Sequence, residues 1–253
     1  MLNHVAPAET ADPAYTRLYT LGSVAAWIAA VLIVGEVLAL AVYPQPGTIR
    51  GWFLLFQRNP IIGLVDFWGL EVLLYAMFTL VFLALYVALR RFNPSRMLIA
   101  LTLAVLGIGI FFATNNPFAM LTLSDQYAAA TTDAERSLFL AAGQALLANT
   151  NQRAVGGFNL GLLLVSAAGL IVASVMFQQD SFSSRTAWVG IVAHALSVAD
   201  YLRQALTSST LIALLLILPN ALFLVLWYAS IGRWLYRRGR LERPVRSSLR
   251  STS

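Results

Sequence analysis

Hydrophobic residues in this sequence gather into long runs, and the shorter polar stretches between them are rich in arginine, asparagine and proline. A helix that crosses the hydrocarbon core of a bilayer needs about 20 apolar residues. Six runs reach or approach that length, at about 19–43, 65–89, 97–113, 155–177, 187–206 and 210–231. The pattern therefore predicts an all-α integral membrane protein, a bundle of six transmembrane helices.

Arginine is distributed unevenly over the connections between these runs. If both termini lie on one side, twelve of the seventeen arginines fall on that side and five on the other. Positive charge near span ends stays in the cytoplasm. We therefore expect a cytoplasmic N-terminal segment (1–17), a six-span domain (18–232) and a basic cytoplasmic tail (233–253) whose arginines neutralise lipid headgroups rather than bind nucleic acid.

Two connections on the predicted outer side carry helical signals. Residues 48–57 include an aromatic cluster in a segment too short to span, which predicts a short helix in the membrane interface. In the long connection 115–153, Thr132-x-x-Glu135 forms a capping box ahead of an amphipathic stretch from Asp133 to Ala148. We expect this helix to lie along the membrane surface, and a further short helical turn to begin at Ser124.

Composition narrows the chemistry. Hydrophobic residues make up 59% of the chain and charged residues 11%, and there is no cysteine, no lysine and only two histidines. Disulfides, thiolate nucleophiles, iron–sulfur clusters and lysine Schiff bases are thereby excluded, as is a multi-histidine metal site in one copy. Because no catalytic motif is present either, we expect no enzymatic activity, no metal and no cofactor.

The polar residues inside the spans form a candidate binding cluster on the outer side. Buried charges are costly and usually face the bundle interior. The cluster comprises Glu36, Glu71, Asn159, Asp200 and Arg203, with Asp66, Asn115 and Asn116 on the same side. One interpretation is an outward-facing pocket in which Arg203 meets an anionic group while the two glutamates face cations or exchange protons. The other is structural, with Asp200 neutralising Arg203 and both glutamates protonated and hydrogen-bonded.

Three further features stand out, and two of them have alternative interpretations. His194 could be the axial ligand of a haem or pigment, or could hydrogen-bond to a neighbouring helix, which we favour. Gly157-x-x-x-Gly161 permits close approach of another helix, more often inside the bundle than at a dimer face. Pro219-Asn220 should kink the last span.

Several specific stretches resemble a known family. The clearest is Leu-Ser-Asp-Gln-Tyr-Ala-Ala-Ala-Thr-Thr from Leu123, and others follow at Ala141 and Phe182. From about Trp52 to Arg240 the chain resembles bacterial multi-pass membrane proteins grouped as the domain of unknown function DUF4386. The resemblance implies a protein of the bacterial cytoplasmic membrane with a long outer connection, and it implies no activity, substrate or catalytic residue.

These observations favour a non-enzymatic membrane protein that serves as an accessory or docking subunit of a larger complex. Its expected partners are the lipid bilayer and other membrane protein subunits, without nucleic acid. One alternative is a small-molecule transporter or receptor that uses the outer polar cluster. A second is a pigment- or haem-associated subunit that acts through His194, and a third, weaker one is an intramembrane enzyme with Glu36 or Glu71 as acid and base.

Overall fold

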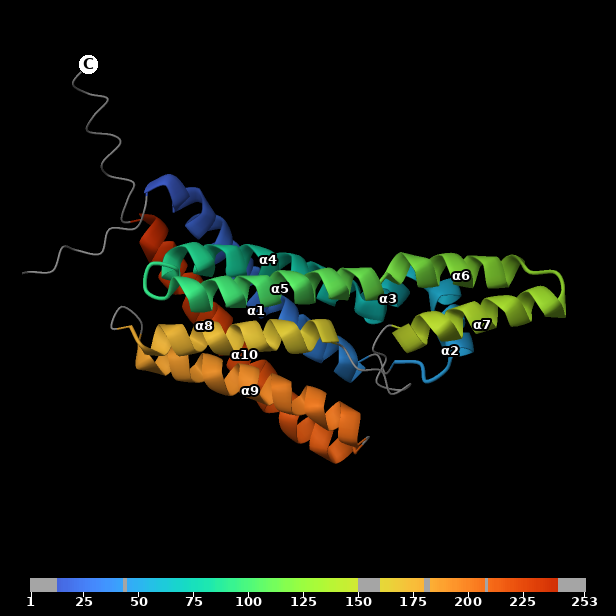
Figure 1. Ribbon diagram of the computed structural model, residues 1–253. Helices are drawn as coiled ribbons and strands as arrows, with labels where there is room; N and C mark the ends of the chain where they lie inside the picture. Colours follow the sequence, from blue (N-terminus) through green and yellow to red (C-terminus); the bar gives the residue numbers. More distant parts are fainter. Residues whose placement is uncertain (1–12, 43–44, 150–159, 180–182, 208, 241–253) are drawn as a thin grey trace, which may run out of the picture.

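The computed structural model describes residues 13–42, 45–149, 160–179, 183–207 and 209–240, and every regular element in these ranges is helical (Figure 1). The elements are η1 (Pro13–Tyr15), α1 (Thr16–Val42), α2 (Ile49–Arg58), α3 (Pro60–Leu64), the π-helical turn η2 (Val65–Gly69), α4 (Leu70–Leu89), α5 (Pro94–Thr114), α6 (Pro117–Ala129), α7 (Asp133–Asn149), α8 (Leu160–Phe177), α9 (Ser184–Leu206) and α10 (Thr210–Arg240).

Six long helices, α1, α4, α5, α8, α9 and α10, form a closed ring in which each one packs against its neighbours in chain order. The ring closes because α1 and α10, from opposite ends of the described chain, share the most extensive helix–helix contact. There the Ser23 hydroxyl donates a 2.8 Å hydrogen bond to the Gly232 carbonyl oxygen. Successive ring helices run in alternating directions (Figure 1).

Three helices begin at the same dipeptide, an asparagine followed by a proline. Asn59, Asn93 and Asn116 each precede a helix and accept a first-turn backbone N–H with the side-chain oxygen. Proline suits the first helical position because its missing N–H would have no helical partner and its φ is already helical. The sequence predicts a helical turn from Ser124, but the Asn116 cap starts α6 earlier, at Pro117.

The interior of the ring is filled toward the α4–α5 connection. Phe82, Leu85 and Leu89 of α4 are buried there in one hydrophobic cluster with Met176 of α8 and Leu235 of α10. Toward the opposite end of the ring the side chains leave a cavity, which is described below. The filled half therefore fixes the helices, and the other half has room for a ligand.

Five of these helices are long and apolar enough to cross a membrane: α1, α4, α5 with its continuation α6, α8 and α10. The fifth predicted span is present as α9, which has the length, but polar residues that include His194, Asp200 and Arg203 lower its hydropathy. The chain is a helical membrane protein, whereas the count of six spans stays a prediction.

Four short helices, α2, α3, α6 and α7, extend beyond one end of the ring (Figure 1), and we call them the distal module. Its own core buries Trp52, Phe53 and Phe56 of α2 with Phe67 and with residues of α6 and α7. The predicted short helix is present as α2, its aromatic rings are covered by protein, and its place in the membrane interface stays a prediction. An amphipathic helix needs an apolar contact, and here α6 and α7 provide it.

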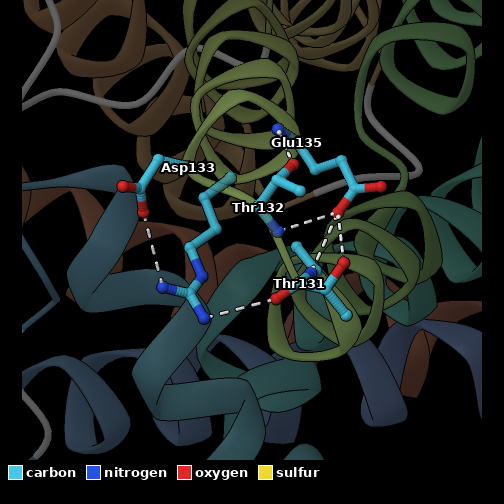
Figure 2. Close-up of polar contacts among 6 residues, drawn as sticks. Thr131, Thr132, Asp133 and Glu135 are labelled. Carbon is cyan, nitrogen blue, oxygen red and sulfur yellow. Dashed lines mark hydrogen bonds and ion pairs between the residues drawn. The ribbon is translucent and has the colours of Figure 1, made fainter.

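The predicted capping box at the start of α7 is confirmed (Figure 2). Glu135 Oε2 accepts hydrogen bonds of 2.9 and 3.1 Å from the backbone N–H groups of Thr131 and Thr132, and the Glu135 N–H donates to Thr132 Oγ1 at 3.2 Å. The orientation of α7 differs from the expected one. It runs antiparallel to α6 along the direction of the ring helices, not across their ends (Figure 1), because α6 and α2 bury its apolar side.

The last helix is longer than its hydrophobic run. α10 continues to Arg240, so the predicted start of a separate tail at 233 falls inside the helix. Two arginines of this extension lie over tryptophan rings: the Arg233 Cζ atom is 5.7 Å from the ring centre of Trp27, and the Arg238 Cζ atom is 4.7 Å from that of Trp234. Such cation–π contacts favour helical order beyond the apolar run.

Candidate functional site: a polar cavity inside the ring

A cavity of about 180 Å³ lies between the ring helices, in the half that is nearer to the distal module. Five of the six ring helices contribute to its wall, and α5 alone does not. Its polar wall residues are Glu36 of α1; Glu71 and Tyr75 of α4; Ser166 of α8; His194, Ser197, Asp200 and Tyr201 of α9; and Asn220 and Tyr228 of α10. The ring therefore brings together polar residues from five separate segments.

Both glutamates of the predicted cluster, Glu36 and Glu71, line this cavity. Glu36 lies near the C-terminal end of α1, and its Oε1 atom is buried without a hydrogen-bond partner. Glu71 lies in the first turn of α4, directly after the π-helical turn, and is close enough to Glu36 for their charges to repel. Two ionised carboxylates this close in a low dielectric are unfavourable, so the pair can share a proton or hold a cation.

Asp200 is the third acidic residue of the wall, and its charge is matched from within its own helix. Arg203 Nε donates to Asp200 Oδ1 at 2.8 Å, and both side chains are buried. Gln204 Nε2 donates to Asp200 Oδ2 at 2.9 Å, and Arg203 Nη1 donates to the Thr207 carbonyl oxygen at 3.1 Å. The one-turn contact predicted from the sequence is confirmed, and it commits Arg203 to Asp200 and to the end of α9.

Asn220 joins α10 to α9, and both helices line the cavity. Its Nδ2 atom donates to the Ala193 carbonyl oxygen at 2.8 Å and to Ser197 Oγ at 2.6 Å. Pro219 directly precedes it inside α10 and removes one backbone hydrogen bond of that helix. The side-chain bonds of Asn220 hold α10 to α9 at this weakened point.

Aromatic rings form much of the remaining wall. Phe78 stacks on Tyr228 with ring centres 5.0 Å apart and planes 12° apart. Tyr75 lies against Phe111 of α5 with ring centres 3.9 Å apart and planes 10° apart. The hydroxyl oxygens of Tyr75 and Tyr228 are buried without hydrogen-bond partners. The cavity wall thus contains aromatic rings together with phenol groups whose hydrogen-bonding capacity is unused.

His194 also lines the cavity, but not in the expected way. The sequence favours a hydrogen bond to a neighbouring helix, whereas both ring nitrogens are buried without a partner. The ring stands edge-on to Trp227, at 4.6 Å between centres and 89° between planes. Its other side meets Gly169 of α8, where a Cβ atom would overlap with the ring. Close packing against these two residues positions the imidazole instead of a hydrogen bond.

This packing disfavours the alternative in which His194 ligates a haem or pigment. The Nε2 side of the ring is covered by the backbone of Gly169. Even drug-sized ligands fill pockets of about 300 to 1,000 Å³, and a macrocycle of that size or more does not fit a cavity of about 180 Å³. The cavity accommodates a smaller molecule.

The other predicted polar residues lie elsewhere. Asn159 is outside the described residues, and Arg203 stands behind the cavity wall through its contact with Asp200. Asp66 is buried in the π-helical turn, and Asn115 is buried at the end of α5. The phenol and hydroxyl groups of the wall were missed, because tyrosine and serine within apolar runs give no periodic signal.

The comparisons with known proteins give a family but no activity. Residues 59–239 match the family described as "Domain of unknown function (DUF4386)", a range that includes every cavity residue named above except Glu36. No curated protein and no solved structure matches the chain. The matched range covers more than half of the 253 residues, and the chain therefore belongs to the DUF4386 family of helical membrane proteins.

Proposed function

We propose that this protein binds a small molecule in the cavity of its helical ring, as a membrane receptor or a transporter does. The observation that carries the proposal is that four residues of the cavity wall, Glu36, Tyr75, His194 and Tyr228, each hold a buried side-chain polar atom without a hydrogen-bond partner. Each buried polar atom left without a hydrogen bond costs about 1 to 3 kcal/mol. A ligand that bonds to them recovers part of this cost.

The surroundings of the cavity support the same function. Binding sites in membrane proteins use polar and ionisable residues that face the bundle interior, and the described acidic residues within the ring helices, Glu36, Glu71 and Asp200, all line the cavity. The filled core at the other end of the ring gives a rigid frame for it. The proposed function is binding of the small molecule, without an enzymatic reaction.

The test is a change that fills the cavity. Ala221→Phe on α10 adds a ring at a wall position, and Leu222→Phe adds the same ring next to it, on an exposed face. The purified proteins in detergent are unfolded by heat with a panel of small amines, carboxylic acids, sugars and alcohols. A ligand at 100 times its Kd stabilises the folded state by about 2.7 kcal/mol.

We expect at least one class of compound to raise the unfolding midpoint of wild type and of Leu222→Phe but not of Ala221→Phe. If no compound raises it, or if Ala221→Phe responds like wild type, the cavity is not a binding site. Counterflow of the stabilising compound in proteoliposomes then separates a transporter, which exchanges it across the bilayer, from a receptor, which does not.

A docking role in a larger complex is the second candidate. Phe118 and Leu138 of the distal module are exposed although both are large and apolar, which favours a protein or lipid contact there. We therefore expect that Leu138→Ser would remove a stoichiometric partner from the purified complex, if docking is the function. The cavity proposal has the stronger support because it accounts for the buried polar atoms without partners, which docking does not explain.

A further inference from the structure

The charge of the cavity wall is acidic. Glu36, Glu71 and Asp200 line it, and no arginine is among the described residues that do so. The sequence contains no lysine that could balance them. Asp200 is matched by Arg203 at 2.8 Å behind the wall, so the acidic character of the cavity is concentrated at Glu36 and Glu71. A low-dielectric site of this kind attracts a positive ligand.

The aromatic rings of the wall also favour a positively charged ligand. Tyr75, Phe78 and Tyr228 present rings to the cavity together with Tyr201. The negative face of an aromatic ring attracts a cation, and the attraction is stronger when both are removed from water. Rings also pack well against the carbon atoms that surround a charged nitrogen. Carboxyl groups and aromatic rings around one small cavity are surroundings that suit an ammonium group.

A bare metal ion fits these residues less well. The described residues contain no group of three or more histidine, cysteine, aspartate or glutamate side chains placed to hold a metal. The cavity is also larger than one ion requires. An engineered apolar cavity of about 150 Å³ holds benzene, so a volume of about 180 Å³ corresponds to about seven non-hydrogen atoms.

From these observations we infer that the ligand is a small organic cation, an ammonium group on a short apolar body, with its charge at Glu36 and its carbon atoms against the rings of Tyr75, Phe78 and Tyr228. This inference rests on the proposed binding function and names the class of ligand. Glu36 supplies the contact because its buried Oε1 has no hydrogen-bond partner.

The experiment compares pairs of compounds that differ in charge but hardly in shape. Choline is paired with dimethylbutanol, in which carbon replaces the charged nitrogen, and butylammonium is paired with butanol. Each is titrated into the purified full-length protein in detergent, and binding is measured by the unfolding midpoint and by calorimetry. We expect an ammonium compound to bind at least about tenfold more tightly than its uncharged partner, a difference of about 1.4 kcal/mol.

Two carboxyl-to-amide variants locate the contact. Glu36→Gln should weaken ammonium binding by about tenfold or more while the ligand-free unfolding midpoint stays near that of wild type. Asp125→Asn, which removes an exposed carboxylate on α6 away from the cavity, should bind like wild type. If Glu36→Gln does not fold, the comparison of paired compounds on wild type still decides the matter.

Each outcome has a distinct meaning. If charged and uncharged partners bind equally, or if only an uncharged compound or an acid binds, the cation inference is wrong while the binding function stands. If Glu36→Gln binds ammonium as wild type does, the placement of the charge is wrong. If no compound binds at all, the proposed binding function fails together with the inference.

Discussion

Asn220 of α10 and Ser197 of α9 are joined by a 2.6 Å hydrogen bond from the amide nitrogen to the hydroxyl oxygen. The same amide also donates to the Ala193 carbonyl oxygen, so a single side chain bridges two helices one residue after a proline. Polar contacts between membrane helices are worth about 0.6 kcal/mol on average and at most about 1.7. This one should lie near the upper limit because it makes two bonds.

Asn220→Leu should therefore lower the free energy of unfolding by about 1 to 2 kcal/mol. The measurement is equilibrium unfolding in mixed micelles of mild detergent and dodecyl sulfate. Leu222→Ala shortens an exposed side chain two residues further along α10. It should lower the free energy of unfolding by less than Asn220→Leu does. Equal effects of the two substitutions would show that the bridge between α9 and α10 contributes nothing.

Gly107 marks the close approach of α5 to α8. A Cβ atom there would lie 2.6 Å from the Gly161 carbonyl oxygen, whereas a Cβ atom at Gly109 would meet nothing within 4 Å. Gly107→Ala should cost about 1 to 3 kcal/mol of stability, because backbone must move. Gly109→Ala should be neutral or stabilise by up to about 1 kcal/mol, because alanine favours helix. Thermal unfolding of the two variants tests the contrast, which a similar loss in both would contradict.

The Asp200–Arg203 pair gives a prediction about buried charge. Arg203→Met leaves Asp200 buried without its cation and should cost about 3 to 5 kcal/mol. The double variant Asp200→Asn with Arg203→Met should recover much of this loss, because no charge is then left behind. A double-mutant cycle in the same unfolding assay measures the coupling. If the double variant loses as much unfolding free energy as the two single variants lose in sum, the pair does not act as a unit.

The start of α7 should respond to pH. Hydrogen bonds from the backbone N–H groups of Thr132 and then Thr131 lower the pKa of Glu135 below its usual value. A lowered pKa in the folded state stabilises above the unfolded pKa, and this stabilisation is lost as pH falls through the folded pKa. Hydrogen exchange at the first-turn amides, corrected for intrinsic rates, should accelerate on acidification in wild type. In Glu135→Gln the corrected rates should not change with pH.

The hydroxyl half of the same capping box can be tested separately. Thr132→Ala removes the Oγ1 acceptor of the Glu135 N–H and should cost about 1 kcal/mol of local helix stability. Faster exchange should be confined to the first turn of α7. Exchange that accelerates over the whole distal module would instead indicate that the cap holds the module together.

Much of the architecture could be predicted because it depends on local signals. Apolar runs locate the ring helices, although α10 continues beyond its run to Arg240. The Thr132–Glu135 spacing starts α7, and the one-turn spacing of Asp200 and Arg203 gives their ion pair. The Asn-Pro pairs at Asn59, Asn93 and Asn116 are also local, and the last of them could have placed the start of α6 correctly.

The cavity could be predicted only in part. Its acidic residues stand out in the sequence because charge is rare in apolar runs, so Glu36, Glu71 and Asp200 were candidates. Tyr75 and Tyr228 were not, because a helix that is apolar all round has no pattern that distinguishes the interior face from the lipid face. The burial of α2 against α6 and α7 likewise depends on contacts between distant segments.

The contact between α1 and α10 bears on how the protein is made. The wall of the cavity needs Glu36 from the first ring helix and Tyr228 from the last, so both must be in the membrane before the site exists. During synthesis, α1 is made first and α10 last, so α1 lacks its most extensive helix contact until the end. A nascent chain that stops before Thr210 lacks α10, so its ring stays open and its cavity has no wall on that side.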